Sequence, residues 1–210
     1  YPWYDRTAAI GSNVDQADVA IASRVFKEDL AANGMELCGL ASCCLDVAHY
    51  NALVSNVKNK ASVLFTATCR LVEEAFERFG DDELQVIVDK HGGRTRYGKN
   101  LLRMFEDMEL RVVKETAAIS SYELRRGEKR MRVHFVVKAD AKYLPVSLAS
   151  MVSKYVRELF VAAINRYFAG KCAGLKATAG YWKDGSRFIV ELKSKFPEVQ
   201  YASEQLIRCR

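Results

Sequence analysis

An aspartate stands directly after a stretch that is typical of a buried strand. Residues 84–88 form a short, almost unbroken apolar run, and Asp89 follows it, with Gly92 and Gly93 close behind. Such a run indicates a strand covered on both faces, as in a parallel sheet. Because ligands of open α/β folds gather at the carboxyl ends of strands, Asp89 is placed where a cation or a phosphate can approach. The alternative is a solvent-exposed turn aspartate that bonds the local backbone.

A glutamate on a predicted helix is the second acidic candidate. Glu158 lies beside the apolar side of the helix expected after Pro145, and Lys154 precedes it by four residues. The alternative is a surface Lys–Glu pair, which stabilises a helix by only about a few tenths of a kcal/mol.

Basic residues gather in two stretches that could contact phosphates. Residues 90–103 contain no acid and carry Lys90, Arg94, Arg96, Lys99 and Arg103. Residues 123–132 carry Arg125, Arg126, Lys129, Arg130 and Arg132 against Glu123 and Glu128. Such patches suit a nucleic-acid backbone, because each Lys or Arg that neutralises a phosphate releases a condensed counterion. The alternative is a solvated charged face.

Composition limits the class of protein. Half of the 210 residues are hydrophobic, which is ample for a packed core, and the net charge of +6 permits an anionic partner without requiring one. No apolar run is long enough to span a membrane, and no secretory signal is visible. The six cysteines and three histidines lack metal-ligand spacing, so we expect free thiols in a reducing compartment. We therefore expect a cytoplasmic monomer.

Apolar spacing predicts the elements that must position the candidate side chains. Helices are expected at residues 18–32, 54–79, 95–107, 145–168 and 185–195. Strands are expected at residues 35–45, 84–88 and 110–113, and at 121–124 and 131–137, which alternate as a hairpin across the turn at 126–128. Residues 1–16 are turn-like. This order predicts an α/β fold with a mixed sheet flanked by helices, in a single domain over residues 1–210.

Several motifs in one order resemble the type 2 ribonuclease H family, ribonucleases HII and HIII. Residues 137–140 read Val-Lys-Ala-Asp and residues 148–158 read Leu-Ala-Ser-Met-Val-Ser-Lys-Tyr-Val-Arg-Glu. The family reads Val-Lys-Gly-Asp, then Ala-Ala-Ser-Ile, then Ala-Lys, two residues and Arg-Asp. Residues 84–89 resemble its strand ending in Val-Asp-Gly, Tyr50-Asn51 its long-helix start, and Thr178-Ala179-Gly180-Tyr181 its His-Lys-Gly-Tyr loop. The resemblance covers roughly residues 48–195.

The resemblance implies a ribonuclease H-like fold and hydrolysis of RNA in RNA–DNA hybrids or at RNA–DNA junctions. Four carboxylates of the family hold two Mg²⁺ or Mn²⁺ ions, and by position Asp89 and Glu158 are the third and fourth of these ligands. Tyr181 corresponds to the tyrosine at the ribose of the cleaved nucleotide. Further nucleic-acid contacts are expected from Lys154 and Arg94, and from Arg125, Arg126 and Arg130 of a basic hairpin that resembles an insertion at residues 119–137.

The sequence departs from the family at its first two carboxylates. The family's Asp-Glu-Ala-Gly-Arg-Gly run does not occur here, and the chain opens at Tyr1 without Met. We therefore expect the two-metal site, and with it the enzyme, only if upstream strands supply those carboxylates. The alternatives are a non-catalytic nucleic-acid-binding relative and an α/β protein whose ligand is unrelated to nucleic acid.

Overall fold

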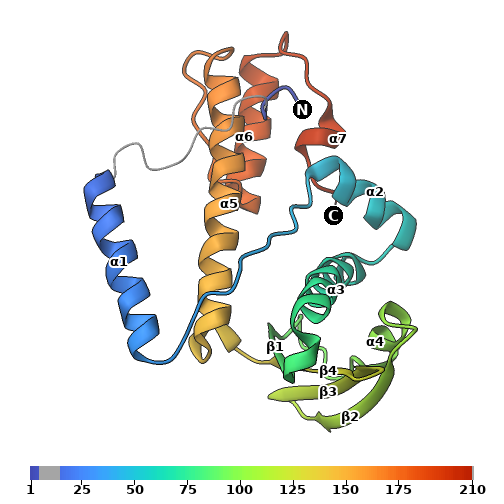
Figure 1. The fold of residues 1–210 in the computed structure, drawn as a ribbon. Coiled ribbons are helices and arrows are strands. Elements are labelled where there is room, and N and C mark those ends of the chain that lie inside the picture. Colours follow the sequence, from blue (N-terminus) through green and yellow to red (C-terminus); the bar gives the residue numbers. More distant parts are fainter. Residues whose placement is uncertain (5–14, 210) are drawn as a thin grey trace. The chain divides into compact units, whose positions relative to one another are not determined.

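The computed structural model describes residues 1–4 and 15–209, which divide into two compact units (Figure 1). The sheet unit comprises Ser42–Ser153 and Ala202–Arg210, and the helical unit comprises Tyr1–Ala41 and Lys154–Tyr201. The boundary falls within one continuous helix, α5 (Leu144–Ala169). The described residues form an α/β structure with one four-stranded mixed sheet and seven α-helices, which confirms the prediction of an α/β protein with a mixed sheet.

The sheet has one parallel pair of strands and two antiparallel pairs. Its order is β1-β4-β3-β2, with β1 (Leu84–Asp89), β2 (Glu109–Glu115), β3 (Ile119–Arg126) and β4 (Lys129–Val136). β1 runs parallel to β4, so the parallel pairing expected for residues 84–88 is confirmed. The expected cover on both faces is wrong, because no residue of β1 is fully buried and Gln85 is exposed on the polar face. β3 and β4 form the predicted hairpin, whose turn uses Gly127 at φ +60°, a conformation that favours glycine.

The core of the sheet unit lies on one face of the sheet. Side chains alternate between the two faces of a strand, and the buried set includes Tyr122, Leu124, Val133 and Phe135. These side chains pack on α3 (Lys60–Phe79) and on the segment that contains α4 (Gly98–Met104). The Tyr97 ring stacks on the Phe135 ring with a centroid distance of 3.7 Å. The opposite face of the sheet is mainly polar, and it carries Asp89.

The long helix expected at residues 54–79 is two helices. α2 (Val47–Val57) ends at Lys58, which adopts φ +52°, and the Asn59 side chain caps α3 by accepting from the N–H groups of Ala61 and Ser62. Asparagine favours a cap over a helix interior because its side chain bonds nearby backbone groups. The continuous apolar spacing concealed this break.

A short C-terminal segment completes the sheet unit. α7 (Ser203–Leu206) lies against α2, and the Asn51 amide donates to the carbonyl oxygens of Glu204 and Ile207 at 3.1 and 2.9 Å. Its oxygen accepts from the Cys209 N–H at 2.7 Å. Asn51 therefore fixes the end of the chain on α2.

The helical unit contains α1 (Gln16–Ala32), most of α5, and α6 (Trp182–Lys195). Its buried residues are Trp3, Ala163, Phe168, Cys172, Phe188 and Leu192, together with Thr178. The Phe168 ring meets the Phe188 ring edge to face at 5.6 Å. α6 begins three residues earlier than expected, and no residue of α1 is buried.

One predicted strand is wrong, and one helix is shorter than predicted. Residues 35–45 form no strand, because no other strand pairs with them and most of their side chains are exposed. The helix predicted at residues 95–107 is reduced to α4. Tyr97 is its N-cap, and the backbone of Phe105, its C-cap, is not helical; both side chains pack into the core. Of the turn-like residues 1–16, positions 5–14 lie outside the described residues.

Two further features are the apolarity of the helices and the state of the cysteines. Within the part of the chain described, no helix combines the length and apolarity needed to cross a bilayer. The described residues include all six cysteines, and none of these forms a disulfide. Burial raises the pKa of the Cys69 thiol to about 12, so this thiol stays protonated at neutral pH.

Candidate functional site

Asp89 ends β1 with its carboxylate exposed and oriented. It pairs with Val136 in the register of β1 and β4. Its Oδ1 accepts the backbone N–H of Ala139 at 2.9 Å, and within the described residues its Oδ2 accepts no hydrogen bond. Ala139 belongs to η2 (Ala139–Ala141), the 3₁₀ turn that follows β4. The Val-Lys-Ala-Asp motif thus supplies the backbone donor that fixes Asp89.

The loop after Asp89 is held by bonds to neighbouring segments. The Lys90 ammonium donates to the carbonyl oxygens of Thr116 and Ala117 at 2.8 and 2.9 Å, so this cation is engaged within the protein. The His91 N–H donates to the Tyr97 hydroxyl at 3.0 Å. Gly92 and Gly93 adopt φ +47° and +74°, so two glycines make the turn.

Arg94 is held on the aromatic part of the core. Its guanidinium carbon lies 5.7 Å from the Phe65 ring centroid and 5.6 Å from that of Tyr97. Burial and the Arg94 charge lower the pKa of His91, and Asp89 opposes them by raising it. His91 is therefore neutral at neutral pH, and Arg94 contributes a fixed positive charge close to the loop.

Glu158 lies on α5 in the helical unit, and it is exposed. The guanidinium of Arg157 lies next to it, with Nη2 3.9 Å from Glu158 Oε1. In the described residues no ion pair joins Glu158 to Lys154, so the surface pair considered as an alternative does not form. Lys154 is exposed on the same helix.

Tyr181 is presented at the surface by Arg157, a residue the candidate set omitted. Arg157 donates to the Ala179 carbonyl oxygen at 2.8 Å and to the Tyr181 hydroxyl oxygen at 3.0 Å. Its guanidinium carbon lies 4.3 Å from the Tyr181 ring centroid, while Tyr181 remains 61% exposed. Arg157 stands at the arginine of the family's Arg-Asp pattern, in which Glu158 takes the place of the aspartate. This match was the signal in the sequence that could have identified Arg157 as a candidate. The helical unit therefore brings Glu158, Arg157 and Tyr181 together.

The loop that carries Tyr181 is bonded on both sides. Asn165 exchanges two hydrogen bonds of 2.8 Å with the backbone of Thr178. Asp184 of α6 accepts from the Ala179 N–H at 2.5 Å and from the Thr178 hydroxyl at 2.8 Å. These bonds and the one from Arg187 lower the pKa of Asp184 to about 2.

The hairpin arginines do not share one environment. Arg126 faces α3, where it forms ion pairs with Glu73, Glu77 and Asp107 at 2.7, 2.5 and 2.7 Å. Arg125 and Arg130 lie on the other face of the sheet, where they pair with Glu123 and Glu83. Three carboxylates already engage Arg126, whereas the side chains of Arg125 and Arg130 are about half exposed.

The described residues do not form a complete metal site. They contain no group of three or more His, Cys, Asp or Glu side chains arranged to hold a metal ion. Asp89 and Glu158 carry the oxygen donors that Mg²⁺ and Mn²⁺ prefer, but they belong to different units. Each of these carboxylates therefore fits such an ion by donor type, and the described residues do not complete its ligand set.

No family model matches this chain, and neither a curated protein nor a solved structure matches it.

Proposed function

We propose that this protein is a ribonuclease H-type endonuclease that acts on RNA in RNA–DNA hybrids or at RNA–DNA junctions. The observation that carries the proposal is Asp89, an exposed carboxylate at the carboxyl end of a parallel strand, oriented by the Ala139 N–H. This is the position where α/β folds present groups to a ligand. The ribonuclease H-like fold and the use of Mg²⁺ or Mn²⁺ belong to the same proposal.

The contact to the ribose is assigned to Tyr181. A tyrosine hydroxyl has one O–H donor and two acceptor lone pairs. Because Arg157 already donates to this oxygen, the Tyr181 O–H remains able to donate to a ribose hydroxyl. Removing that donor should reduce discrimination between RNA and DNA, since the 2′-hydroxyl is what distinguishes them.

Cleavage of a labelled hybrid in Mn²⁺ or Mg²⁺ tests the proposal. Asp89→Asn and Glu158→Gln should each reduce the rate by about 10²-fold or more, because each removes a charge that the reaction needs. Asp140→Asn is the matched control, since Asp140 is an exposed neighbour in η2 with no assigned role. Unchanged cleavage by Asp89→Asn would refute the assignment.

A second candidate is a non-catalytic relative that binds nucleic acid. The observation that favours it is that the described residues lack a complete group of metal ligands. Such a protein would bind the hybrid with steep salt dependence and leave it intact in either metal. Metal-dependent cleavage that Asp89→Asn abolishes would exclude this candidate.

A further inference from the structure

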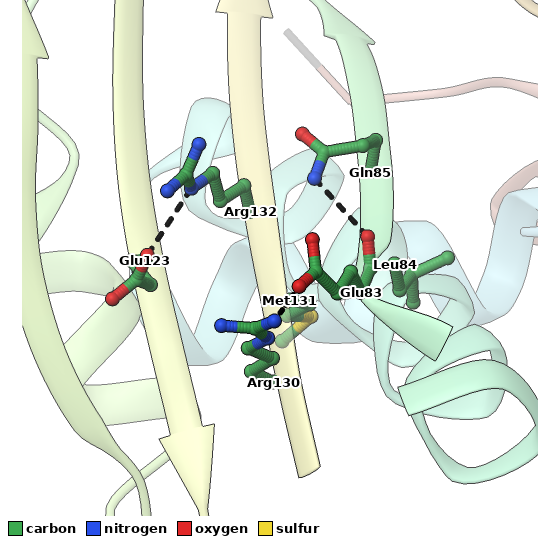
Figure 2. Close-up of a pocket in the computed structure, with 7 residues that line it drawn as sticks. All are labelled: Glu83, Leu84, Gln85, Glu123, Arg130, Met131 and Arg132. Carbon is green, nitrogen blue, oxygen red and sulfur yellow. Dashed lines mark hydrogen bonds and ion pairs between the residues drawn. The ribbon is translucent and has the colours of Figure 1, made fainter. Parts of the chain in front are cut away.

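Three guanidinium groups converge on one buried carboxylate at the polar face of the sheet. Glu123 of β3 has a side chain only 6% exposed, and Arg132 Nε and Arg111 Nη2 each lie 3.1 Å from its Oε2. Arg125 Nε lies 3.3 Å from its Oε1. Figure 2 shows the Arg132 side chain reaching from β4 to Glu123. Three adjacent strands therefore contribute one arginine each.

Glu123 cannot neutralise this cluster. The carboxylate is ionised, because the bonds from Arg132 and Arg111 lower the pKa of Glu123. One negative charge then faces three positive ones, in a group whose members would otherwise repel one another. The cluster therefore has a net positive charge of about two, which an anionic partner can neutralise.

The net charge of this region stays positive when the neighbouring charged side chains are included. Arg130 pairs with Glu83 at the edge of a hollow that Gln85, Glu123 and Arg132 also line. The register places Glu109 and Lys114 of β2 on the same face, where they add one charge of each sign. The arginine face is defined here as Arg111, Arg125, Arg130 and Arg132 around Glu123. When the adjacent Lys114, Glu83 and Glu109 are included, five cations face three carboxylates.

The arginines keep most of their donors available. A guanidinium has five N–H donors, and Glu123 engages each of its three partners through one nitrogen. The side chains of Arg111, Arg125 and Arg132 are 66%, 51% and 48% exposed. Guanidinium groups in a fixed orientation match the oxygen pairs of phosphate groups.

The arginine face also shares its side of the sheet with Asp89. Gln85 pairs with Arg132 in the register of β1 and β4, and Asp89 lies four residues further along β1 on the same face. At about 3.3 Å per residue this separation is about 13 Å. It corresponds to about four nucleotides at about 3.4 Å of rise for each one.

We propose that the arginine face binds the sugar–phosphate backbone of the nucleic acid, about four nucleotides away from the position of Asp89. The proposal rests on the proposed function for its ligand class and adds a second contact region to it. Arg126 does not belong to this region, because its guanidinium is engaged by Glu73, Glu77 and Asp107 on the opposite face.

Binding of a fluorescently labelled RNA–DNA hybrid, two helical turns long, tests the proposal at several salt concentrations with EDTA present. The variant Arg111→Gln/Arg125→Gln keeps Arg132 on Glu123, so the buried carboxylate remains paired. The plot of log affinity against log salt should become shallower, with the magnitude of its slope reduced by about 2. The affinity should fall by about tenfold or more at about 0.1 M salt. Lys60→Gln/Arg70→Gln is the matched control, because it removes two exposed charges from α3.

A variant that keeps both positive charges distinguishes the loss of phosphate contacts from a change in structure. Arg111→Lys/Arg125→Lys should keep the slope of the unmodified protein, because each Lys still neutralises a phosphate. Equal slopes for the Gln variant and the α3 control would overturn the proposal. It would also be overturned if the Gln variant lost binding to polyglutamate while its hybrid binding stayed unchanged, since the face would then serve an acidic protein.

The two proposals can fail separately, because binding is measured without metal and cleavage with it. Intact cleavage with no arginine effect on binding would refute only the arginine face. An arginine effect on binding without any cleavage would refute only the nuclease. A protein that binds no nucleic acid at all would refute both.

Discussion

At the scale of single residues, the loop that carries Tyr181 is held in place by the side chains of neighbouring residues. Asn165 and Asp184 bond the backbone of the loop, and Arg187 donates both to Asp184 and to the carbonyl oxygen of Ala177. A side chain can read a ribose only if its position varies little, and supporting bonds of this kind restrict it. Single substitutions in this loop, or in the side chains that bond it, should therefore have measurable effects on stability.

Gly180 should tolerate no side chain. It adopts φ +73°, and a Cβ there would lie 2.7 Å from Cγ2 of Val161. We expect Gly180→Ala to lower the free energy of unfolding by about 1–3 kcal/mol, through strain and overpacking. Urea denaturation measures this loss. Gly185→Ala is the control, since a Cβ there has no neighbour within 4 Å and replacing a helical glycine should stabilise by up to about 1 kcal/mol. Equal stability of the two variants would contradict the argument.

Asp184 should make stability depend on acid pH. Its pKa in the folded chain is about 2, below the ordinary aspartate value of about 4. The folded state thus holds the ionised form more tightly, so its contribution is fully present above about pH 4 and disappears as the pH falls towards 2. Asp184→Asn should be less stable than the unmodified protein at pH 7, and the difference should shrink between about pH 4 and 2. Asp140→Asn should show no such dependence, and parallel pH profiles for Asp184→Asn and the unmodified protein would refute the role.

At the scale of elements, one arginine links the hairpin to the helix that covers the sheet. Arg126 lies at the end of β3, 5.3 Å from the Phe76 ring centroid, and it bridges two glutamates of α3. Three acidic side chains converge on it and would repel one another without it. This is the structural function of a residue that the sequence grouped with the nucleic-acid contacts.

Replacing Arg126 should weaken the sheet unit rather than nucleic-acid binding. We expect Arg126→Gln to reduce the free energy of unfolding by about 1–2 kcal/mol, which is more than an isolated exposed pair contributes. The loss should shrink at high salt, which screens the interactions of exposed charges. Arg125→Gln is the control and should lose less than about 0.5 kcal/mol, because Glu123 keeps two other partners. Urea denaturation at two salt concentrations compares the two variants. Equal losses of unfolding free energy would contradict a special structural role for Arg126.

The sequence predicted the elements well where periodicity and turn residues agree. The strand at residues 84–88, the hairpin and the helices of the second half are present, because each pairs with or packs on a segment with a matching pattern. Residues 35–45 are apolar, but no strand pairs with them, and local composition cannot reveal that. The break at Lys58 and Asn59 depends on a cap that continuous apolar spacing conceals.

The candidate site was predictable where it depends on position along an element. Asp89 follows from the end of its strand, whereas Tyr181 was a candidate only through the resemblance of residues 178–181 to the loop of a known family. The separation of Arg125 from Arg126 follows from the alternation of side chains along a strand. The sequence missed it because the strand was predicted to end at residue 124, whereas β3 continues to Arg126. The convergence of Arg111 and Arg132 on Glu123 required the pairing of three strands, which no local pattern specifies.

At the scale of the whole molecule, the proposed chemistry requires residues of both units. Asp89 belongs to the sheet unit and Glu158 to the helical unit, and α5 runs through the boundary between them. The arginine face, in contrast, lies within the sheet unit alone. Metal binding and backbone binding should therefore respond to different substitutions.

Titration of Mn²⁺ tests whether metal binding and backbone binding depend on different residues. We expect Asp89→Asn and Glu158→Gln each to weaken Mn²⁺ binding by about tenfold or more, since loss of even an outer partner of a ligand costs about 10–100-fold. Arg111→Gln/Arg125→Gln should leave Mn²⁺ binding unchanged, because a guanidinium has no acceptor with which to ligate a cation. Isothermal titration of Mn²⁺ into the unmodified protein and these variants measures the losses. Asp140→Asn is the control and should bind Mn²⁺ as the unmodified protein does. Equal Mn²⁺ affinity of Asp89→Asn and the unmodified protein would show that the ligand role proposed for Asp89 is wrong.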